Sequence, residues 1–425
     1  MEQFLRTIQT IIPTPIFTWA QPTYHRILAL AGALIYRFPS RHITVIGVTG
    51  TKGKSSTVEL INAFLEEAGH KTALSSTIHF KIDKEYIDNM YKMSMPGRMV
   101  VQRLLRRAVN AGCTHIVMEI TSQGYLQYRN KYIDLDTVVF TNIAPEHIDS
   151  HGSYDAYLKA KLEIVKEIEK SKKPHKTIVI NRDDKESSKF LEIKCDERRL
   201  FGIEDALPYT LKKEGFDMTF QGEAMSSHLS GVFNIYNVLA AANAALAHSI
   251  TKEQIRSALS KFTGIRGRVE KIDVGQDFTV IVDYAHTTDS LEKLYQVFEN
   301  SRIIAVLGGT GGGRDNWKRK EMGRIADTYS ESIILTNEDP YDEDPEQIVK
   351  DVAQGITSQT PVIIMDRRAA IREAISQART GDVILITGKG TDPYIMGPKG
   401  TKEPWDDARV AREELIAQIT GHTTE

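Results

Sequence analysis

Short apolar runs alternate with longer segments whose apolar residues recur every three or four positions, from residue 43 to about residue 262. The short runs are rich in β-branched residues and predict buried strands, whereas the longer spacing is typical of helices packed on one face. We predict strands over 43–46, 114–120, 137–141 and 177–180, and helices over 99–111 and 154–170 among those between them. Such alternation predicts an α/β domain with a mainly parallel sheet.

A second alternating set follows the segment 264–268, with strands predicted at 278–283, 303–307, 332–335 and 382–386. It predicts a smaller, Rossmann-like α/β domain, in which ligands bind at the carboxyl ends of the strands. We therefore expect a short N-terminal segment over 1–42, a central domain over 43–263 and a C-terminal domain over 264–425. The poorly periodic segment 194–222 predicts a small antiparallel excursion.

The apolar segment 24–38 predicts a helix packed on the domain behind it, with a helix lying on a membrane surface as the alternative. Its longest apolar run, 27–35, is too short to span a bilayer. The first residues are not a basic leader followed by an apolar core, so no signal peptide is apparent. We expect no membrane span.

A glycine-rich run, GVTGTKGKSST over 47–57, lies between the first predicted strand and an apolar segment with helical spacing. Backbone amides of such a turn and the positive end of the helix favour an anion. Lys54 can then reach the β- and γ-phosphates of a nucleoside triphosphate, and Ser55 can hold Mg²⁺. The standard spacing would put its first glycine at Val48, whereas the glycines are Gly47 and Gly50. A glycine-rich turn without a ligand is the alternative.

Composition narrows the function classes. A chain of 425 residues predicts two or three domains. The net charge of −2 gives no electrostatic signature of nucleic-acid binding. Two cysteines, Cys113 and Cys195, cannot form a zinc ribbon or a disulfide framework, and their scarcity suits a reducing cytoplasm. We expect a cytoplasmic monomer that acts on small molecules.

Polar side chains follow two of the predicted strands. Glu119 ends one strand, and Asn142 and His147 follow the next. Lys161 lies on the following predicted helix. Because the carboxyl ends of parallel strands share an edge with the phosphate loop, these groups are expected around the γ-phosphate. Glu119 and His147 are candidate Mg²⁺ ligands for phosphoryl transfer. The alternatives are a surface or capping role for Glu119 and a solvated position for Lys161.

The set TGTKGKSS, MEITS, FTNIAPEHIDSHGSYDAYLKAK, GVFNIYNVLAA, GRVE, VDYAHTTDSL, EDPYDEDPEQI and GKGTDPY resembles the Mur ligase superfamily, in order, from residue 43 to the C-terminus. VDYAHTTDSL is similar to the branch that makes UDP-N-acetylmuramyl-tripeptides. The resemblance implies an ATP- and Mg²⁺-dependent amide ligase. In that reaction a substrate carboxylate attacks the γ-phosphate to give an acyl phosphate, and an amino acid amine then displaces phosphate.

The resemblance also implies roles for individual residues. Lys54, Glu119, His147 and Lys161 would be catalytic, with Ser55, Glu119, His147 and a carbamylated Lys161 at the metal. ATP would be held by Gly50, Thr51, Gly53, Lys54, Ser55, Ser56, Asn142, Asn234, Asn237, Arg268, Asp283 and His286, clamped between the two domains. The acceptor would contact Pro96, Thr121, Ser122 and Arg129, and the incoming amino acid Glu338, Asp339, Tyr341, Gly388 and Asp392. Helix capping for Asn234 or Asn237, a surface ion pair for Arg268 and a turn for Asp283 are the alternatives.

Several positions depart from the family pattern. Only 42 residues precede the first strand where a uridine-nucleotide domain is usual, so we expect nucleotide-sugar binding to be weakened or differently built. Tyr341 stands where diaminopimelate-adding members carry an arginine, and tyrosine makes no bidentate pair with a carboxylate. Asp339, Asp342, Glu343 and Asp344 add negative charge, which favours a basic amino acid.

Four further positions also differ. Thr391 and Asp392 replace His-Glu in the same amino-acid pocket, Lys52 replaces a common asparagine, and Gln123 a frequent histidine. A relative acting on a folate, cyanophycin or pseudomurein acceptor, and a non-catalytic ATP-binding module, are the alternative functions.

Overall fold

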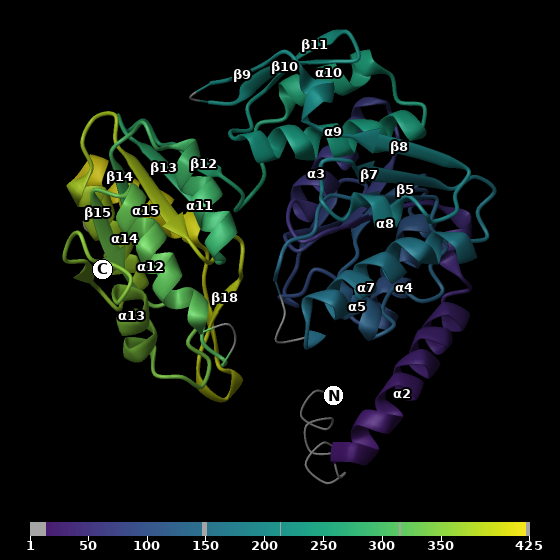
Figure 1. The fold of residues 1–425 in the computed structure, drawn as a ribbon, viewed down its shortest axis with the longest axis horizontal. Helices are drawn as coiled ribbons and strands as arrows, with labels where there is room; N and C mark the ends of the chain where they lie inside the picture. Colours follow the sequence, from purple (N-terminus) through teal and green to yellow (C-terminus); the bar gives the residue numbers. More distant parts are fainter. Residues whose placement is uncertain (1–13, 147–150, 213, 314–315, 422–425) are drawn as a thin grey trace. The chain divides into compact units, whose positions relative to one another are not determined.

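The computed structural model describes residues 14–146, 151–212, 214–313 and 316–421, with side chains from residue 21 onward. The chain forms two compact units (Figure 1). The first comprises residues 1–209, 218–225 and 233–261, and the second residues 210–217, 226–232 and 262–425.

An eight-stranded sheet forms the centre of the first unit. Its strand order is β4 (Glu85–Asp88), β3 (His79–Ile82), β2 (Thr72–Ser75), β5 (His115–Glu119), β1 (Thr44–Thr49), β6 (Thr137–Phe140), β7 (Thr177–Asn181) and β8 (Glu197–Phe201). The pairs from β2 to β8 are parallel, and β3 and β4 add an antiparallel edge. The prediction of a mainly parallel sheet is therefore confirmed. The strands β2, β3 and β4 had no predicted counterpart.

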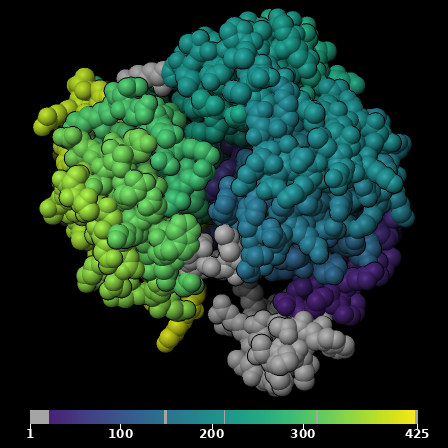
Figure 2. Space-filling model, viewed as in Figure 1, coloured from purple at the N-terminus to yellow at the C-terminus, as the bar shows by residue number. Residues whose placement is uncertain are grey.

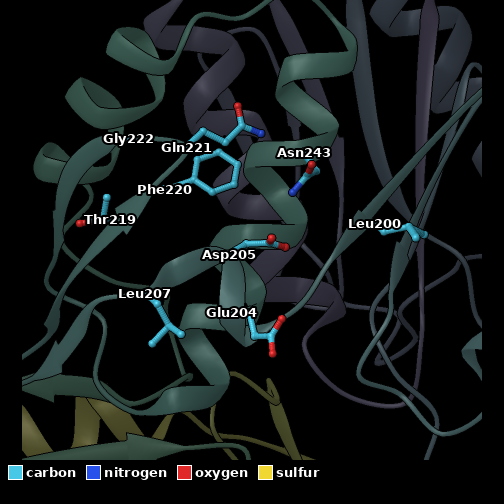
Figure 3. A pocket seen from close by; sticks show the side chains of 9 residues that line it. All are labelled: Leu200, Glu204, Asp205, Leu207, Thr219, Phe220, Gln221, Gly222 and Asn243. Carbon is cyan, nitrogen blue, oxygen red and sulfur yellow. The ribbon is translucent and has the colours of Figure 1, made fainter.

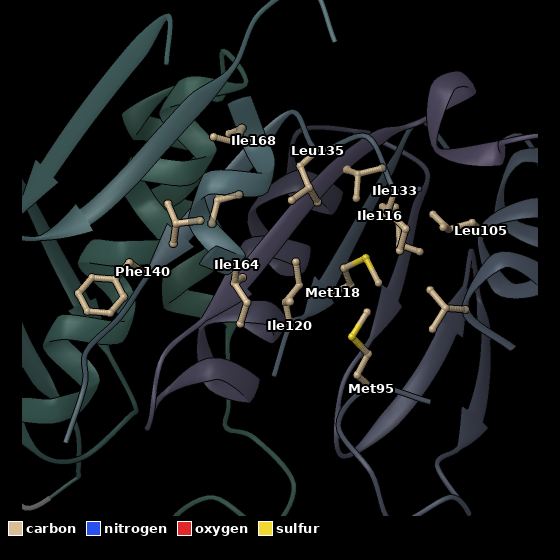
Figure 4. Packing of buried hydrophobic residues seen from close by; sticks show 14 of the residues in the cluster. Met95, Leu105, Ile116, Met118, Ile120, Ile133, Leu135, Phe140, Ile164 and Ile168 are labelled. Atoms are coloured by element: carbon tan, nitrogen blue, oxygen red, sulfur yellow. The ribbon is translucent and has the colours of Figure 1, made fainter. Parts of the chain in front are cut away.

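Helices accompany this sheet in the chain order that the alternation predicted. They are α2 (Thr14–Ile35), α3 (Lys54–Glu67), α4 (Arg98–Asn110), α5 (Ser122–Leu126), α7 (Tyr154–Lys166), α8 (Ser187–Phe190), α9 (Val232–Ala247) and α10 (Lys252–Lys261), with short 3₁₀ turns η1 (Pro39–His42), η2 (Glu167–Lys170) and η3 (Ile203–Ala206). Figure 4 shows the core on one face, where Ile116, Met118 and Phe140 from the strands pack with Leu105 of α4 and Ile164 of α7. Strands buried on both faces read as continuous apolar runs, which explains the sequence signal.

A three-stranded sheet with the order β11 (Glu223–Ser227), β10 (Phe216–Phe220), β9 (Tyr209–Leu211) follows η3. The poorly periodic segment predicted as one excursion is thus divided. Its early part, β8, pairs in parallel with β7 in the large sheet, and only the part from Tyr209 onward forms the small sheet. The strand β8 was missed because its alternate residues face solvent, with the burial of Arg198 and Leu200 differing from that of Phe201.

The second unit has a six-stranded sheet in the order β12 (Glu270–Ile272), β13 (Thr279–Asp283), β17 (Val383–Thr387), β14 (Ile303–Leu307), β15 (Ser332–Leu335) and β16 (Val362–Ile363). All pairs are parallel except β12–β13. Its other elements are α11 (Thr288–Val297), α12 (Trp317–Tyr329), α13 (Pro345–Ala353), α14 (Arg367–Gln377), α15 (Asp407–Thr420), η4 (Pro398–Gly400) and the hairpin strands β18 (Tyr394–Met396) and β19 (Lys402–Pro404).

Successive strand residues of this unit enter different cores. Ile303, Ala305 and Leu307 pack with α11, α12 and α13, whereas Ile304 and Val306 pack with α14 and α15. This alternation is the two-residue period of a strand covered on both faces. The predicted second α/β domain is therefore confirmed in fold class. Within the described ranges, none of the helices has the length and apolar character needed to cross a bilayer.

Three histidine rings lie in a row near the strand ends of the large sheet that are opposite the phosphate loop. The ring centroids of His70 and His115 are 4.4 Å apart, and those of His115 and His248 are 5.5 Å apart. Burial, followed by the charge of His248, lowers the pKa of His115 from 6.5 to about 3. Burial, followed by His70, lowers the pKa of His248 to about 4. Both rings are thus neutral in the folded protein near pH 5.

We expect the free energy of unfolding to fall as the pH drops below 6.5. Below this pH the two histidines become protonated in the unfolded chain, whereas they remain neutral in the folded protein. At pH 5 each ring should cost about 2 kcal/mol relative to neutral pH. Urea unfolding between pH 7.5 and 5 measures this slope. The double variant His115→Gln/His248→Gln should flatten it, while the exposed control His175→Gln should not; equal slopes for all three proteins would contradict the assignment.

Candidate functional site

The phosphate-binding candidate is a four-residue turn, residues 50–53, between β1 and α3. Gly50 has φ 152° and Gly53 has φ 81°, conformations that residues with a Cβ rarely adopt. A Cβ at Gly50 would lie 1.9 Å from Thr141 Oγ1. The two glycines needed by this turn are therefore Gly50 and Gly53, which accounts for the absence of glycine at position 48. Lys54, the first helical residue, donates from Nζ to the carbonyl oxygens of Gly50 and Thr51, each at 2.9 Å.

Gly53→Ala should disturb this turn in two ways. The alanine would be strained at this positive φ, and its Cβ would also clash with Asn237, because it would lie 2.3 Å from Asn237 Oδ1. Gly69 is a matched control, since its φ is 86° and nothing lies within 4 Å of the position that an added methyl group would take there. We expect Gly69→Ala to cost about 1–2 kcal/mol of stability and to leave ATP affinity unchanged. Gly53→Ala should also weaken ATP binding at least tenfold. Calorimetric titration with ATP tests this, and equal affinities for both variants would contradict it.

The segment after β6 forms hydrogen bonds with the phosphate loop. Asn142 Oδ1 accepts from Lys52 N at 2.9 Å, and Asn142 Nδ2 donates to Lys52 O at 3.1 Å. Thr141 Oγ1 also donates to Lys52 O, at 2.7 Å. The Lys52 ammonium forms a 3.1 Å ion pair with Glu146. Lys52, which departs from the family pattern, thus occupies a position that the neighbouring loop accommodates.

A buried carboxylate and two hydroxyls meet beside the loop. Glu119 ends β5, where the sheet register pairs it with Val48 of β1. Ser55 Oγ donates to Glu119 Oε1 at 2.8 Å. Thr77 donates to the same carboxylate through its backbone N at 2.7 Å and through Oγ1 at 3.0 Å. Two of the predicted metal ligands, Ser55 and Glu119, are thus in direct contact, with oxygen donors of the kind that Mg²⁺ prefers.

Lys161 approaches the loop from α7 and is only 2% exposed. Its Nζ donates to Gly50 O at 2.8 Å and to Thr49 Oγ1 at 3.4 Å. Burial, followed by the charge of Lys54, holds the pKa of Lys161 well below its usual value. The alternative of a solvated helix position is therefore wrong for this lysine. A lowered pKa increases the share of the unprotonated amine, which is the nucleophilic form.

His147, another of the predicted metal ligands, lies outside the described residues. The nearby His151 is described, and its Nε2 lies 3.1 Å from Ser122 Oγ. Among the described residues, no group of three or more His, Cys, Asp and Glu side chains is arranged to hold a metal ion.

Two neighbouring asparagines of α9 were predicted to bind ATP. Asn234 and Asn237 are buried, and Asn237 Nδ2 donates to Asn234 Oδ1 at 2.9 Å. The helix begins at Val232, so Asn237 is interior and helix capping is not its role. The Asn237 amide lies next to the phosphate loop, because it occupies the space that a side chain at position 53 would need.

The predicted acceptor residues lie around α5 and the start of α4. Arg129 donates through Nη1 to the carbonyl oxygen of Met95, the residue before Pro96, and through Nη2 to Gln127 Oε1 at 2.6 Å. Thr121 is the N-cap of α5 and accepts from Gly124 N at 3.0 Å. The Thr121 hydroxyl therefore has a structural bond, whereas Ser122 faces His151.

In the second unit, Arg268, Asp283 and His286 gather around Tyr284. The Arg268 guanidinium lies 4.6 Å from the centroid of the Tyr284 ring, and the His286 ring lies 4.6 Å from the same ring. Asp283 accepts from the backbone N of Val269 and of Ala285, each at 2.7 Å. Asp283 thus has the turn-forming role that was the alternative interpretation. Its bond to Val269 also fixes the loop that carries Arg268.

The predicted amino-acid residues follow β15 and β17. Glu338 is buried, accepts from Thr310 Oγ1 at 2.7 Å, and has its other carboxylate oxygen, Oε2, buried without a hydrogen-bond partner. Burial, followed by Asp339, raises the Glu338 pKa. Gly388 leaves room for this carboxylate, because a Cβ there would lie 2.4 Å from Glu338 Oε2.

Lys389 is fully buried between these strands and was not predicted. Its Nζ lies 2.8 Å from Asp339 Oδ1 and 3.4 Å from Asp392 Oδ2, and donates to Tyr394 O at 2.6 Å. A protein ammonium therefore pairs with two of the acidic residues assigned to the incoming amino acid.

The other acidic residues of this loop are also partnered within the chain. Asp342 accepts from Lys399 N at 2.6 Å, Glu343 pairs with Arg319 at 2.7 Å, and Asp344 caps α13. The expected preference for a basic amino acid loses this part of its support, because the added negative charge is used internally. Tyr341 has φ 53°, and its backbone N donates to Met396 O at 2.9 Å.

A separate cavity of about 290 Å³ lies elsewhere in the first unit (Figure 3). Phe220 of β10, the adjoining turn residue Gln221, Glu204 of η3 and Asn243 of α9 are among the residues that line it. None of its lining residues is a predicted site residue. Asn243 Nδ2 already donates to Leu239 O at 2.9 Å.

Sequence reasoning missed Thr77 and Lys389. Thr77 lies in a short connection between strands and carries no motif, so only the fold brings it to Glu119. Lys389 does stand between two glycines in the GKG run, beside the predicted Gly388. A lysine in such a turn at a strand end was a usable signal.

Family models match most of this chain. The Mur ligase middle domain matches residues 48–245, and the Mur ligase glutamate ligase domain matches residues 267–390. This chain belongs to the Mur ligase family. Its Mur ligase relatives include a UDP-N-acetylmuramoyl-L-alanyl-D-glutamate–2,6-diaminopimelate ligase of Syntrophomonas wolfei, 37% identical over 94% of this chain and 83% of that protein. A UDP-N-acetylmuramyl-tripeptide synthetase of Roseiflexus is 35% identical over 94% of this chain and 84% of that protein.

Solved Mur ligase structures share the fold. A UDP-N-acetylmuramoyl-L-alanyl-D-glutamate–2,6-diaminopimelate ligase is 28% identical, with a TM-score of 0.61 over 90% of this chain and 79% of that one. The Mycobacterium tuberculosis folylpolyglutamate synthase has a TM-score of 0.68 over 94% of this chain and 96% of that one, at 17% identity, which shows the fold alone. The resemblance predicted from the motifs is confirmed.

Proposed function

We propose that this Mur ligase adds an amino acid to UDP-N-acetylmuramyl-L-alanyl-D-glutamate, using ATP and an acyl phosphate, in peptidoglycan precursor synthesis. The names of relatives 35–37% identical over nearly the whole chain support the substrate class. A cytoplasmic location and a monomeric state are part of the proposal.

The observation that carries the proposal is the contact between Ser55 and Glu119 beside the phosphate loop. A helix-start hydroxyl and a strand-end carboxylate form the common metal-holding pair of phosphate-loop enzymes. Their oxygen donors fit Mg²⁺, and His147 is the third proposed ligand. When bound, the metal would neutralise charge on the β- and γ-phosphates.

Around that centre the residues of this chain have distinct tasks. Lys54 would exchange its loop carbonyl partners for γ-phosphate oxygens, while the amides of the turn orient the phosphates. Asn234 and Asn237 would hold the adenine. In the second unit, Arg268 would bind the phosphates and Asp283 the ribose, with His286 beside Asp283. Arg129 would hold the acceptor, so that its carboxylate oxygen attacks phosphorus in line and ADP leaves. The amine then attacks the acyl carbon, and phosphate leaves.

We also propose that Lys161 is carbamylated. The unprotonated Nζ would attack CO₂, form an N–C bond and release one proton, leaving a carbamate anion. Support comes from its burial and lowered pKa, since only the neutral amine attacks CO₂. The modification would replace a cation by a carboxylate-like oxygen donor suited to the metal.

For the incoming amino acid we propose a diamino acid, lysine or diaminopimelate. The buried, unpartnered Glu338 Oε2 suits an ammonium group. The distal carboxylate that distinguishes diaminopimelate from lysine would have no arginine at position 341.

Tyr341→Arg should therefore shift the preference toward diaminopimelate, because a guanidinium binds a carboxylate with two hydrogen bonds. We expect about a tenfold rise in the ratio of kcat/KM for diaminopimelate over lysine. Tyr341→Phe is the control and should leave this ratio unchanged. An unchanged ratio in the arginine variant would mean that this loop does not select the amino acid.

The proposed function is tested by incubating the chain with ATP, Mg²⁺ and UDP-N-acetylmuramyl-L-alanyl-D-glutamate while scanning single amino acids. Mass spectrometry of a tripeptide product, formed only when all components are present, is the expected result. ATP binding without product from any amino acid would overturn the proposed acceptor or the proposal of catalysis.

A further inference from the structure

Helix α2 packs on the first unit by one face only. That face contains Ala29, Gly32 and Ala33, which are buried. It lies close to α4, because a Cβ at Gly32 would be 3.0 Å from Met99 Sδ. Figure 2 shows the N-terminal segment, in purple, at the surface of the molecule. The opposite face of the helix is therefore directed away from α4.

That opposite face is also apolar. Ile27, Leu30 and Leu34 lie three and four residues apart, so they line one side of the helix, which we call the α2 stripe. They are between 39% and 61% exposed, and the exposed residues Tyr24 and Ile35 continue the stripe at its two ends. A helix that is apolar all round is typical of a protein core or of contact with lipid. We therefore expect a second surface to cover the α2 stripe.

The charge around the α2 stripe is positive. Asp and Glu are absent between residues 3 and 58 and between residues 89 and 118, the segments that contain α2 and α4. Arg26 of α2, Arg37 after it and Arg103 of α4 are exposed. Among the described residues, no carboxylate forms an ion pair with any of these three arginines. Because the net charge of the whole chain is −2, this pair of helices is a local concentration of positive charge.

We propose that the α2 stripe docks on the surface of an anionic lipid bilayer, with the helix lying in the plane of the interface. Its apolar side chains would enter the boundary below the headgroups, and the arginines would contact the lipid phosphates. A second copy of this chain is a poorer occupant, since two such surfaces would bring the arginines of both copies together. The proposal goes beyond the proposed function and does not depend on catalysis.

Sedimentation of the full chain with lipid vesicles tests the docking directly. One set of vesicles contains phosphatidylglycerol and phosphatidylcholine, and the other contains phosphatidylcholine alone. We expect affinity about thirtyfold higher for the anionic vesicles, because each arginine near the surface is attracted by anionic lipid. Added salt should reduce this difference. Absence of binding to the anionic vesicles, or equal affinity for both sets, would overturn the proposal.

Ile27→Gln/Leu34→Gln tests the apolar part of the contact. It should weaken binding to the anionic vesicles about tenfold, because the strength of interfacial binding scales with the apolar area buried. Ile416→Gln/Ile419→Gln is the matched control, since these are exposed apolar residues of α15. The control should bind like the unchanged protein. Equal losses in the two variants would overturn the role of the α2 stripe.

Arg26→Gln/Arg103→Gln tests the charged part in the same way. It should weaken binding to the anionic vesicles about tenfold. Arg409→Gln/Arg412→Gln, which changes two exposed arginines of α15, is the control for the same change in net charge and should have little effect. Equal losses would mean that only net charge matters and would overturn the docking surface. Unchanged affinity for a non-hydrolysable ATP analogue establishes that each variant is folded.

Sedimentation velocity without vesicles distinguishes the other possible occupants. We expect no self-association through the α2 stripe. A dimer that Ile27→Gln/Leu34→Gln dissociates, together with no vesicle binding, would assign the stripe to a second copy and overturn the proposal. Neither a dimer nor vesicle binding would leave a segment of the same chain, such as residues 1–13, as the occupant, and would equally overturn it.

Discussion

Lys161→Ala is expected to reduce ligation about a thousandfold while leaving the fold intact. The side chain is buried beside the phosphate loop, and its proposed carbamate would supply charge at the centre where phosphate is transferred. Bicarbonate should increase the activity of the unchanged protein after dialysis against CO₂-free buffer, and should not affect the variant. Initial rates of ADP release measure both effects.

The control for this variant is Lys159→Ala, since Lys159 is an exposed residue of the same helix. It should retain full activity and bicarbonate response. Unaffected ligation in Lys161→Ala, together with no bicarbonate response in the unchanged protein, would show that the carbamate assignment is wrong. A ¹³C-NMR carbamate signal after addition of ¹³CO₂ gives a reading independent of activity.

Lys54→Met should have a comparably large effect, about a thousandfold on kcat. Its ammonium already reaches the carbonyl oxygens of Gly50 and Thr51, which places it within the turn that would hold the phosphates. Methionine retains the apolar stem and removes the charge. Because Lys54 also contributes to lowering the Lys161 pKa, the variant should raise that pKa and weaken the bicarbonate response.

Single-turnover rates separate these contributions. Lys52→Met is the matched control within the same loop, where the lysine pairs with Glu146 at the rim. We expect Lys52→Met to change kcat less than tenfold. If both variants lost activity equally, the loss would reflect damage to the loop and not removal of the Lys54 charge.

The sequence predicted the sheets because their strands are buried on both faces. Strands such as β1, β5 and β14 read as continuous apolar runs, and the helices between them follow the helical period. The strands β3, β4 and β8 are short or half-exposed edge elements, and their pattern is not distinguishable from that of loops. Edge strands depend on pairing with a neighbour more than on their own residues.

The candidate site was predictable to the extent that each residue ends a strand or begins a helix. Ser55, Glu119 and Lys161 come together as expected because the parallel topology brings those ends to one edge. Thr77 was not predictable, since a short loop returns it to Glu119. The internal pairing of Asp339 with Lys389 was also hidden, because charge in the sequence does not indicate which acid already has a partner.

The central claim is that the acceptor carboxylate attacks the γ-phosphate of ATP. Acceptor labelled with ¹⁸O in its reacting carboxylate tests it directly, with the released phosphate read by mass spectrometry. The account predicts one ¹⁸O atom in each phosphate, because the amine attacks the acyl carbon and the former carboxylate oxygen leaves with the phosphate. Phosphate without ¹⁸O would show that water, and not the acceptor, attacks ATP, and would contradict the proposed ligation.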